Sequence, residues 1–183
     1  LEGASVLDVG TGSGVWGTAF ARAAPRVQVT YFDQPAVIER VRSNVERMGV
    51  GAQARYLSED LFTHAFEAHA FDVVILPQVL NVLRPEDVPG LLARVARALR
   101  PGGVLVIAEY VLDEGRHGPL GHLYFGLRRF ITNEGDLFSA SEYAELLRAA
   151  GLPHARCFSL GSQEVIFGAR SDVALPLQLV PEA

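Results

Sequence analysis

The chain has 183 residues, of which 49% are hydrophobic and 20% charged, and its formal net charge is −5. This composition is typical of a soluble globular protein, and the length suits one domain with a substantial core. The basic residues are scattered, which argues against nucleic acid as a partner. No apolar run reaches the 18 residues of a membrane helix, and no secretory signal pattern precedes the first apolar run, so we expect no membrane partner.

The cysteine content bears on the cellular compartment and on metal binding. Cys157 is the single cysteine, which excludes an internal disulfide and a cysteine-based metal site. We therefore expect a cytoplasmic protein without a metal ion.

Short apolar runs alternate with longer amphipathic segments, which is the pattern of βαβ units. Strands are predicted at residues 5–9, 27–32, 52–57, 71–76 and 104–108, with helices at 14–24 and 35–48 and a third that begins at Pro85. An apolar segment at 123–131 follows a glycine-rich loop. A capping-box pattern at 139–142 then predicts a helix to about Gly151, followed by closing strands at 155–160 and 164–169.

These elements predict an α/β fold: a doubly wound, mostly parallel, seven-stranded sheet with an antiparallel C-terminal strand. One domain covers residues 1–170, and the tail 171–183 receives no structural prediction. In such sheets ligands bind beyond the carboxyl ends of the strands, near the point where the strand order reverses. Residues that directly follow strands are therefore the candidate site residues.

The first candidate is the loop Asp8-Val9-Gly10-Thr11-Gly12-Ser13-Gly14 after the first strand. Glycines allow a tight turn and close approach of a ligand to the main chain, and the free N–H groups of the following helix favour a polar or anionic group. The loop predicts a nucleotide-like ligand.

A dinucleotide is one alternative, because residues 12–17 match the pattern G-x-G-x-x-G and Asp33 lies at a suitable distance. The tight-turn glycine of that pattern should come first, however, at Gly10. Counted from Gly10, the sixth position is Val15, and the dinucleotide interpretation fails.

Acidic residues also follow the next two strands. Asp33, followed by Gln34, ends the second strand, and a carboxylate there can accept both hydroxyl hydrogens of a ribose. After the third strand, Asp60 can accept from an adenine amino group while Leu61 or Phe62 covers the ring. Three acidic residues after three successive strands are more informative than any one of them.

Together these stretches, with Phe32 to Ile38 and Leu99 to Glu109, resemble the catalytic domain of class I methyltransferases. More narrowly, they resemble the family of plant caffeate-type and bacterial polyketide and carotenoid O-methyltransferases. The resemblance implies that S-adenosylmethionine is the cofactor, held within a site formed by Asp8, Gly10, Gly12, Asp33, Gln34, Asp60, Leu61 and Phe62. Family members carry an N-terminal dimerisation domain that is absent from these residues, so a homodimer is expected only with it.

The chain departs from the family where the catalytic base should lie. The resemblance places Asn81 at the position of the base histidine and Pro77 at that of a lysine. An amide cannot act as a general base. Of two glutamates that orient the histidine, one corresponds to Glu109, whereas the other falls near Leu137, beside Asp136.

Three interpretations remain open. Positioning alone can lower the barrier to methyl transfer, and a phenol or enol of low pKa needs little help. Another base can serve instead, with His117 and His122 as candidates. Alternatively, the protein binds S-adenosylmethionine but does not methylate, as in tailoring hydroxylases or decarboxylases.

We expect methyl transfer to an oxygen, or secondarily a carbon, of a hydrophobic or aromatic small molecule. Four aromatic residues are candidate walls of the substrate pocket: Phe62, Tyr124, Phe125 and Phe130. The paired residues Arg128 and Arg129 are candidates for an acidic substrate group.

Overall fold

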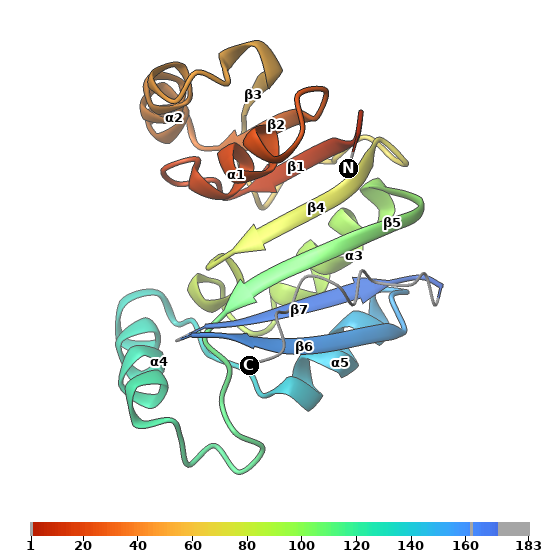
Figure 1. Cartoon of the computed structure of the whole chain (residues 1–183). Coiled ribbons are helices and arrows are strands. Elements are labelled where there is room, and N and C mark those ends of the chain that lie inside the picture. The colour runs from red at the N-terminus through yellow and green to blue at the C-terminus, as the bar shows by residue number, and fades with distance from the viewer. Residues whose placement is uncertain (1, 162, 172–183) are drawn as a thin grey trace.

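The computed structural model describes residues 2–161 and 163–171 (Figure 1). Its strands are β1 (Ser5–Val9), β2 (Gln28–Asp33), β3 (Ala54–Ser58), β4 (Phe71–Pro77), β5 (Leu99–Glu109), β6 (His154–Leu160) and β7 (Gln163–Ala169). Its α-helices are α1 (Val15–Ala23), α2 (Pro35–Arg47), α3 (Val88–Ala98), α4 (Leu120–Asn133) and α5 (Ala140–Ala149), with short 3-10 helices η1 (Gly51–Gln53) and η2 (Leu80–Val82).

The strands form one sheet in the order β3-β2-β1-β4-β5-β7-β6. All neighbours from β3 to β5 are parallel, while β7 runs antiparallel to both β5 and β6. The predicted fold class is confirmed. The strand order reverses between β1 and β4, which places the expected ligand position at the carboxyl ends of these two central strands.

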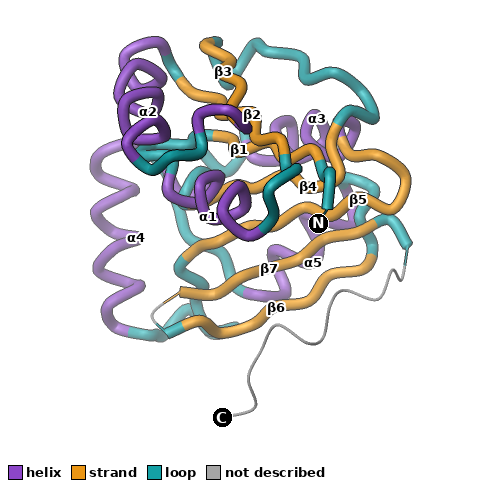
Figure 2. Tube along the Cα trace, turned by 45° about the horizontal axis from the view of Figure 1, so that its top comes forward, coloured by secondary structure: helices purple, strands orange, loops and turns teal. Residues whose placement is uncertain are grey.

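Two apolar cores cover the two faces of the sheet. One joins α1 and α2 to the sheet, with Val29 and Val41 among its buried members. The other joins α3 and α5, with Leu92 and Leu147 among its members. Figure 2 shows α1 and α2 on one side of the strands and α3 and α5 on the other. Parallel strands buried on both faces explain why their sequences are continuous apolar runs.

Two boundaries differ from the sequence prediction. The third helix begins at Val88 rather than at Pro85. Residues 84–87 form a turn, in which Asp87 N–H donates to the carbonyl of Arg84, and Pro89 is the proline of the first helical turn. Strand β5 begins at Leu99 instead of Val104, because residues 101–103 form an irregularity within the strand rather than a separate turn.

The helix predicted from the capping box is confirmed as α5. Ser139 Oγ accepts from Glu142 N–H at 3.3 Å, and Glu142 Oε2 accepts from Ser139 N–H at 2.7 Å. This reciprocal pair satisfies two N–H groups that otherwise lack partners at a helix start.

Helix α4 stands apart, beyond the ends of β4 and β5 (Figure 1). None of its residues is buried, and five large apolar side chains are 57% to 81% exposed: Leu120, Tyr124, Leu127, Phe130 and Ile131. In the described part of the chain, no helix is long and apolar enough to cross a bilayer. Of the predicted tail, residues 172–183 lie outside the described residues.

Candidate active site

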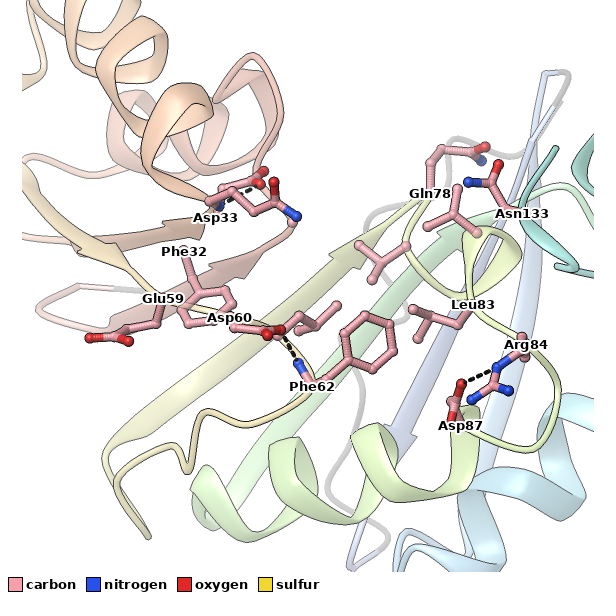
Figure 3. A pocket seen from close by; sticks show the side chains of 15 residues that line it. Phe32, Asp33, Glu59, Asp60, Phe62, Gln78, Leu83, Arg84, Asp87 and Asn133 are labelled. Carbon is pink, nitrogen blue, oxygen red and sulfur yellow. Dashed lines mark hydrogen bonds and ion pairs between the residues drawn. The ribbon is translucent and has the colours of Figure 1, made fainter.

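A cavity of about 520 Å³ opens at the carboxyl edge of the parallel strands (Figure 3). This volume falls in the range of small-molecule sites. Its lining comes from the ends of β1, β2, β3 and β4 and the segments that follow them, with one residue of α4. The lining residues are Gly10, Phe32, Asp33, Gln34, Glu59, Asp60, Leu61, Phe62, Gln78, Val79, Val82, Leu83, Arg84, Asp87 and Asn133.

The glycine loop after β1 borders this cavity through Gly10. Gly10 has φ +64°, and a Cβ placed on it would lie 2.7 Å from Val79 Cγ2. The N–H groups of Gly10 and Thr11 both donate to the carbonyl of Phe32, at 2.9 and 3.1 Å. The loop is therefore tied to β2 and held against the segment after β4, in a conformation that requires glycine.

Asp8 supports this loop from below. It is fully buried, and its Oδ2 accepts from Thr11 Oγ1 at 2.7 Å and from Gly17 N–H at 2.9 Å. Burial raises the pKa of Asp8 to about 6, against the lowering effect of these two hydrogen bonds. Asp8 does not line the cavity, so the structure gives it a supporting position.

The match of residues 12–17 to a dinucleotide pattern has a structural explanation in Gly17. A Cβ on Gly17 would lie 2.6 Å from Tyr31 Cε1 and 2.8 Å from Asp8 Oδ2. Gly17 is thus needed for close packing of α1 on the sheet, whichever ligand the loop binds.

The acidic residues after β2 and β3 both reach the cavity, as the sequence predicts. Asp33 Oδ2 accepts from Gly12 N–H at 3.0 Å, and its Oδ1 accepts from Gln34 N–H at 2.8 Å. Gly12 itself is outside the cavity lining and contributes by this bond. The backbone of the glycine loop therefore fixes the direction of the Asp33 carboxylate.

Asp60 lies in the turn after β3, where its Oδ1 accepts from Phe62 N–H at 2.8 Å. Arg94 of α3 donates to the carbonyl of Leu61 at 2.7 Å, which anchors this turn to the helix. Leu61 is half-buried, whereas Phe62 is 58% exposed beside the cavity. Figure 3 shows Phe62 between Asp60 and the side chains that follow β4.

Asn81 and Glu109 lie in direct contact beneath the cavity, and both are fully buried. Asn81 Nδ2 donates to Glu109 Oε2 at 2.5 Å, and Glu109 Oε1 accepts from Leu80 N–H at 2.9 Å. Burial raises the pKa of Glu109 to about 7, although these hydrogen bonds oppose the shift. Among the described residues, Asn81 Oδ1 is buried and has no hydrogen-bond partner. Neither residue is among those that line the cavity.

The candidate alternative bases lie elsewhere. His117 N–H donates to Asp113, and His122 Nδ1 lies 2.7 Å from the carbonyl of Val111. Neither histidine lines the cavity. Asp136, the candidate second acidic partner, forms an ion pair with Arg116 at 3.0 Å.

Of the four aromatic residues expected to wall a substrate pocket, only Phe62 lines this cavity. Phe125 packs on Tyr110, with ring centroids 4.6 Å apart. The guanidinium group of Arg129 lies over the Phe125 ring, 4.7 Å from its centroid. Phe130 borders a separate small cavity, and Tyr124 is 72% exposed.

Sequence reasoning missed several residues here. Gln78, Arg84 and Asn133 line the cavity, and Gly135 packs so closely on Asn81 that a Cβ would lie 2.2 Å from its carbonyl oxygen. For Gln78, the available signal was its position directly after the apolar run of β4. For Gly135 and Asn133, nothing local indicated that the end of α4 meets the segment after β4.

A doubly wound sheet with acidic residues after β2 and β3 around one cavity defines an α/β protein with a nucleotide-like ligand site. Comparison with known proteins identifies the family. The O-methyltransferase domain model matches residues 2–153, and the chain belongs to that family.

The chain is 35% identical over 148 residues to acetylserotonin O-methyltransferase of Rattus norvegicus, covering 81% of this chain and 34% of that protein. It is 25% identical to the tetracenomycin polyketide 8-O-methyl transferase TcmO of Streptomyces glaucescens, over 90% of this chain and 48% of that protein. The chain thus spans half or less of the length of these relatives.

Solved structures of methyltransferases have a fold similar to that of this chain. An O-methyltransferase family 2 protein from Planctomyces limnophilus in complex with apigenin has a TM-score of 0.85 and 26% identity, over 92% of this chain and 51% of that chain. Human N-acetylserotonin methyltransferase in complex with SAM has a TM-score of 0.81 and 25% identity, over 91% of this chain and 47% of that chain.

Proposed function

We propose that this chain is the catalytic part of a methyltransferase that transfers a methyl group from S-adenosylmethionine to an oxygen of an aromatic or hydrophobic small molecule. The observation that carries the proposal is the convergence of Gly10, Asp33 and Asp60, which follow three different strands, on one cavity. Membership of the O-methyltransferase family and the human relative's complex with SAM support the cofactor.

The residues of the cavity fit this cofactor chemically. Asp33 offers a carboxylate to the ribose hydroxyls, since Gly12 and Gln34 N–H groups orient it without using all its lone pairs. Asp60 offers its remaining oxygen to the adenine amino group, and Leu61 and Phe62 offer apolar surface to the ring. Bound there, S-adenosylmethionine supplies an electrophilic methyl group on a positively charged sulfur.

The glycine loop has a supporting part in this proposal. Val79 leaves no room for a side chain at Gly10, so a ligand in the cavity faces the main chain of the loop there. Asp8 holds the loop in shape through Thr11 and Gly17. We therefore assign binding to Gly10, Asp33, Gln34, Asp60, Leu61 and Phe62, and loop support to Asp8 and Gly12.

We further propose a cytoplasmic enzyme that acts on small molecules and forms a homodimer with the help of an additional N-terminal domain. The lone Cys157 supports the compartment. The greater length of the relatives supports a further domain.

Transfer of isotope from methyl-labelled S-adenosylmethionine to a panel of phenols tests the function. We expect a labelled methyl ether from at least one phenol, together with binding of S-adenosylhomocysteine in calorimetry. Binding without any labelled product would support the non-methylating alternative, and absence of binding would overturn the proposal altogether.

A further inference from the structure

Three side chains form a hydrogen-bonded chain from the buried interior to the cavity: Glu109, Asn81 and Gln78. Asn81 Nδ2 donates to Glu109 Oε2 and also to Gln78 Oε1, the latter at 3.1 Å. In its ionised form Glu109 only accepts hydrogen bonds, and this form holds the NH₂ side of the Asn81 amide toward it. Both hydrogens of that NH₂ are then used, and the Gln78 carbonyl is turned toward Asn81. One hydrogen of the Gln78 NH₂ group goes to the carbonyl of Ala108 at 3.3 Å, which leaves the second hydrogen for a ligand.

Gln78 occupies an unusual backbone position in the lining of the cavity. It directly follows β4 and has φ +57°, a left-handed conformation that long side chains rarely adopt. Its N–H donates to the carbonyl of Ala108 at 2.9 Å, which fixes it against β5. Positive φ occurs at four non-glycine residues in the described part of the chain, and of these only Gln78 lines the cavity; such strained positions cluster at active sites.

The location of Gln78 agrees with a functional role. Gln78 and Gly10 line the same cavity from β4 and β1, the two strands between which the strand order reverses. Figure 3 shows Gln78 beside Asn133, across the cavity from Asp33. The side chain is half-buried, and among the described residues its Nε2 donates one long hydrogen bond, of 3.3 Å to the carbonyl of Ala108.

Resting on the proposed function, we propose that Gln78 donates a hydrogen bond from Nε2 to the oxygen that accepts the methyl group, and that the site selects readily ionised phenols or enols. Asn81 is a positioning residue in this account, because it acts on the substrate only by orienting Gln78.

The chemistry of the amide leads to the substrate class. An N–H donor stabilises negative charge on oxygen but cannot remove a proton. Asn81 cannot remove one either, and neither His117 nor His122 lines the cavity. Since none of these three residues serves as the base, the proposal has the phenol lose its proton to bulk water before transfer. A lone pair of the phenolate oxygen then forms the new C–O bond, while the electrons of the broken C–S bond stay on sulfur.

Binding of 4-nitrophenol to the protein saturated with S-adenosylhomocysteine tests this inference without turnover, because phenolate and phenol absorb differently. We expect the protein to bind the phenolate form preferentially. Gln78→Leu and the isosteric Gln78→Glu should each weaken phenolate binding at least tenfold, with unchanged affinity for S-adenosylhomocysteine. Gln28→Leu, at the amino end of β2, is the matched control and should bind phenolate as the wild type does.

The positioning role of Asn81 has its own readout. Asn81→Leu should weaken phenolate binding while the affinity for neutral phenol and for S-adenosylhomocysteine stays the same, a change that general loss of packing would not produce. Unchanged phenolate affinity in both Gln78 variants, with S-adenosylhomocysteine still bound, would overturn the inference alone. Failure of the wild type to bind S-adenosylhomocysteine would overturn the proposed function and this inference with it.

Discussion

The amide of Asn81 donates a 2.5 Å hydrogen bond to the carboxylate of Glu109, and both side chains are fully buried. This contact holds the carboxyl group of Glu109 within the fold, where the positive charge of Arg129 also favours its ionised form. Glu109 is therefore an acidic group whose ionisation opposes folding, because burial disfavours its charged form.

Stability should therefore depend on pH through Glu109. Burial raises its pKa from 4.5 to about 7, so the folded chain favours the protonated form. The stabilising contribution is complete below pH 4.5 and is lost as the pH rises through about 7. Relative to Glu109→Gln, the wild type should lose on the order of 3 kcal/mol of unfolding free energy between pH 4.5 and 8.

Urea unfolding at a series of pH values measures this difference. Glu145→Gln is the control, since its exposed side chain on α5 should give a curve parallel to the wild type. Parallel curves for wild type and Glu109→Gln would show that Glu109 is not responsible.

Introducing a base should widen the range of acceptors. In Asn81→His, one ring nitrogen can donate to Glu109, which leaves the other nitrogen free to accept a proton, as a general base does. We expect turnover of weakly acidic hydroxyl substrates to rise at least tenfold, whereas acidic phenols gain nothing from a base and lose the hold of Asn81 on Gln78. Steady-state rates across phenols of graded acidity measure this, with Asn81→Leu as control. An equal change at every acidity would contradict the prediction, provided S-adenosylhomocysteine still binds.

A methyl group at Gly10 should damage both the fold and the site. Gly10→Ala forces a left-handed alanine, which costs about 1 kcal/mol, and its Cβ would also displace Val79 at the cavity wall. Gly49→Ala is the matched control, because Gly49 has φ +74° with no atom within 4 Å of the added Cβ.

Denaturant unfolding and calorimetry separate the two effects. Both variants should lose stability, but only Gly10→Ala should lose affinity for S-adenosylhomocysteine, at least tenfold. Equal affinities in the two variants would remove the glycine loop from the binding site.

The fold could be predicted from sequence because its signals are local. Apolar runs such as residues 5–9 indicate where each strand ends. The strand ends in turn predict that Asp33 and Asp60 meet at one edge of the sheet, where both line the cavity. The misplaced helix start at Pro85 has a local cause too, because a proline suits a turn as well as a first helical position.

What could not be predicted depends on distant contacts. A carboxylate after a strand can face a ligand, as Asp33 does, or support its own loop, as Asp8 does. The sequence also did not reveal Gln78, whose proposed role is argued from its left-handed backbone and from the hydrogen bond that it accepts from Asn81. The need for glycine at Gly135 depends on its close contact with the carbonyl of Asn81, which is far away in the sequence.

Calorimetric titration with S-adenosylhomocysteine of Asp33→Asn, beside Asp72→Asn as the matched control, tests the central claim most directly. Asp72 lies at the amino end of β4, where it pairs with Arg100, and does not line the cavity. We expect tight binding by the wild type and by Asp72→Asn and at least a tenfold weaker affinity for Asp33→Asn. Equal affinities in all three proteins would contradict the placement of the cofactor in this cavity.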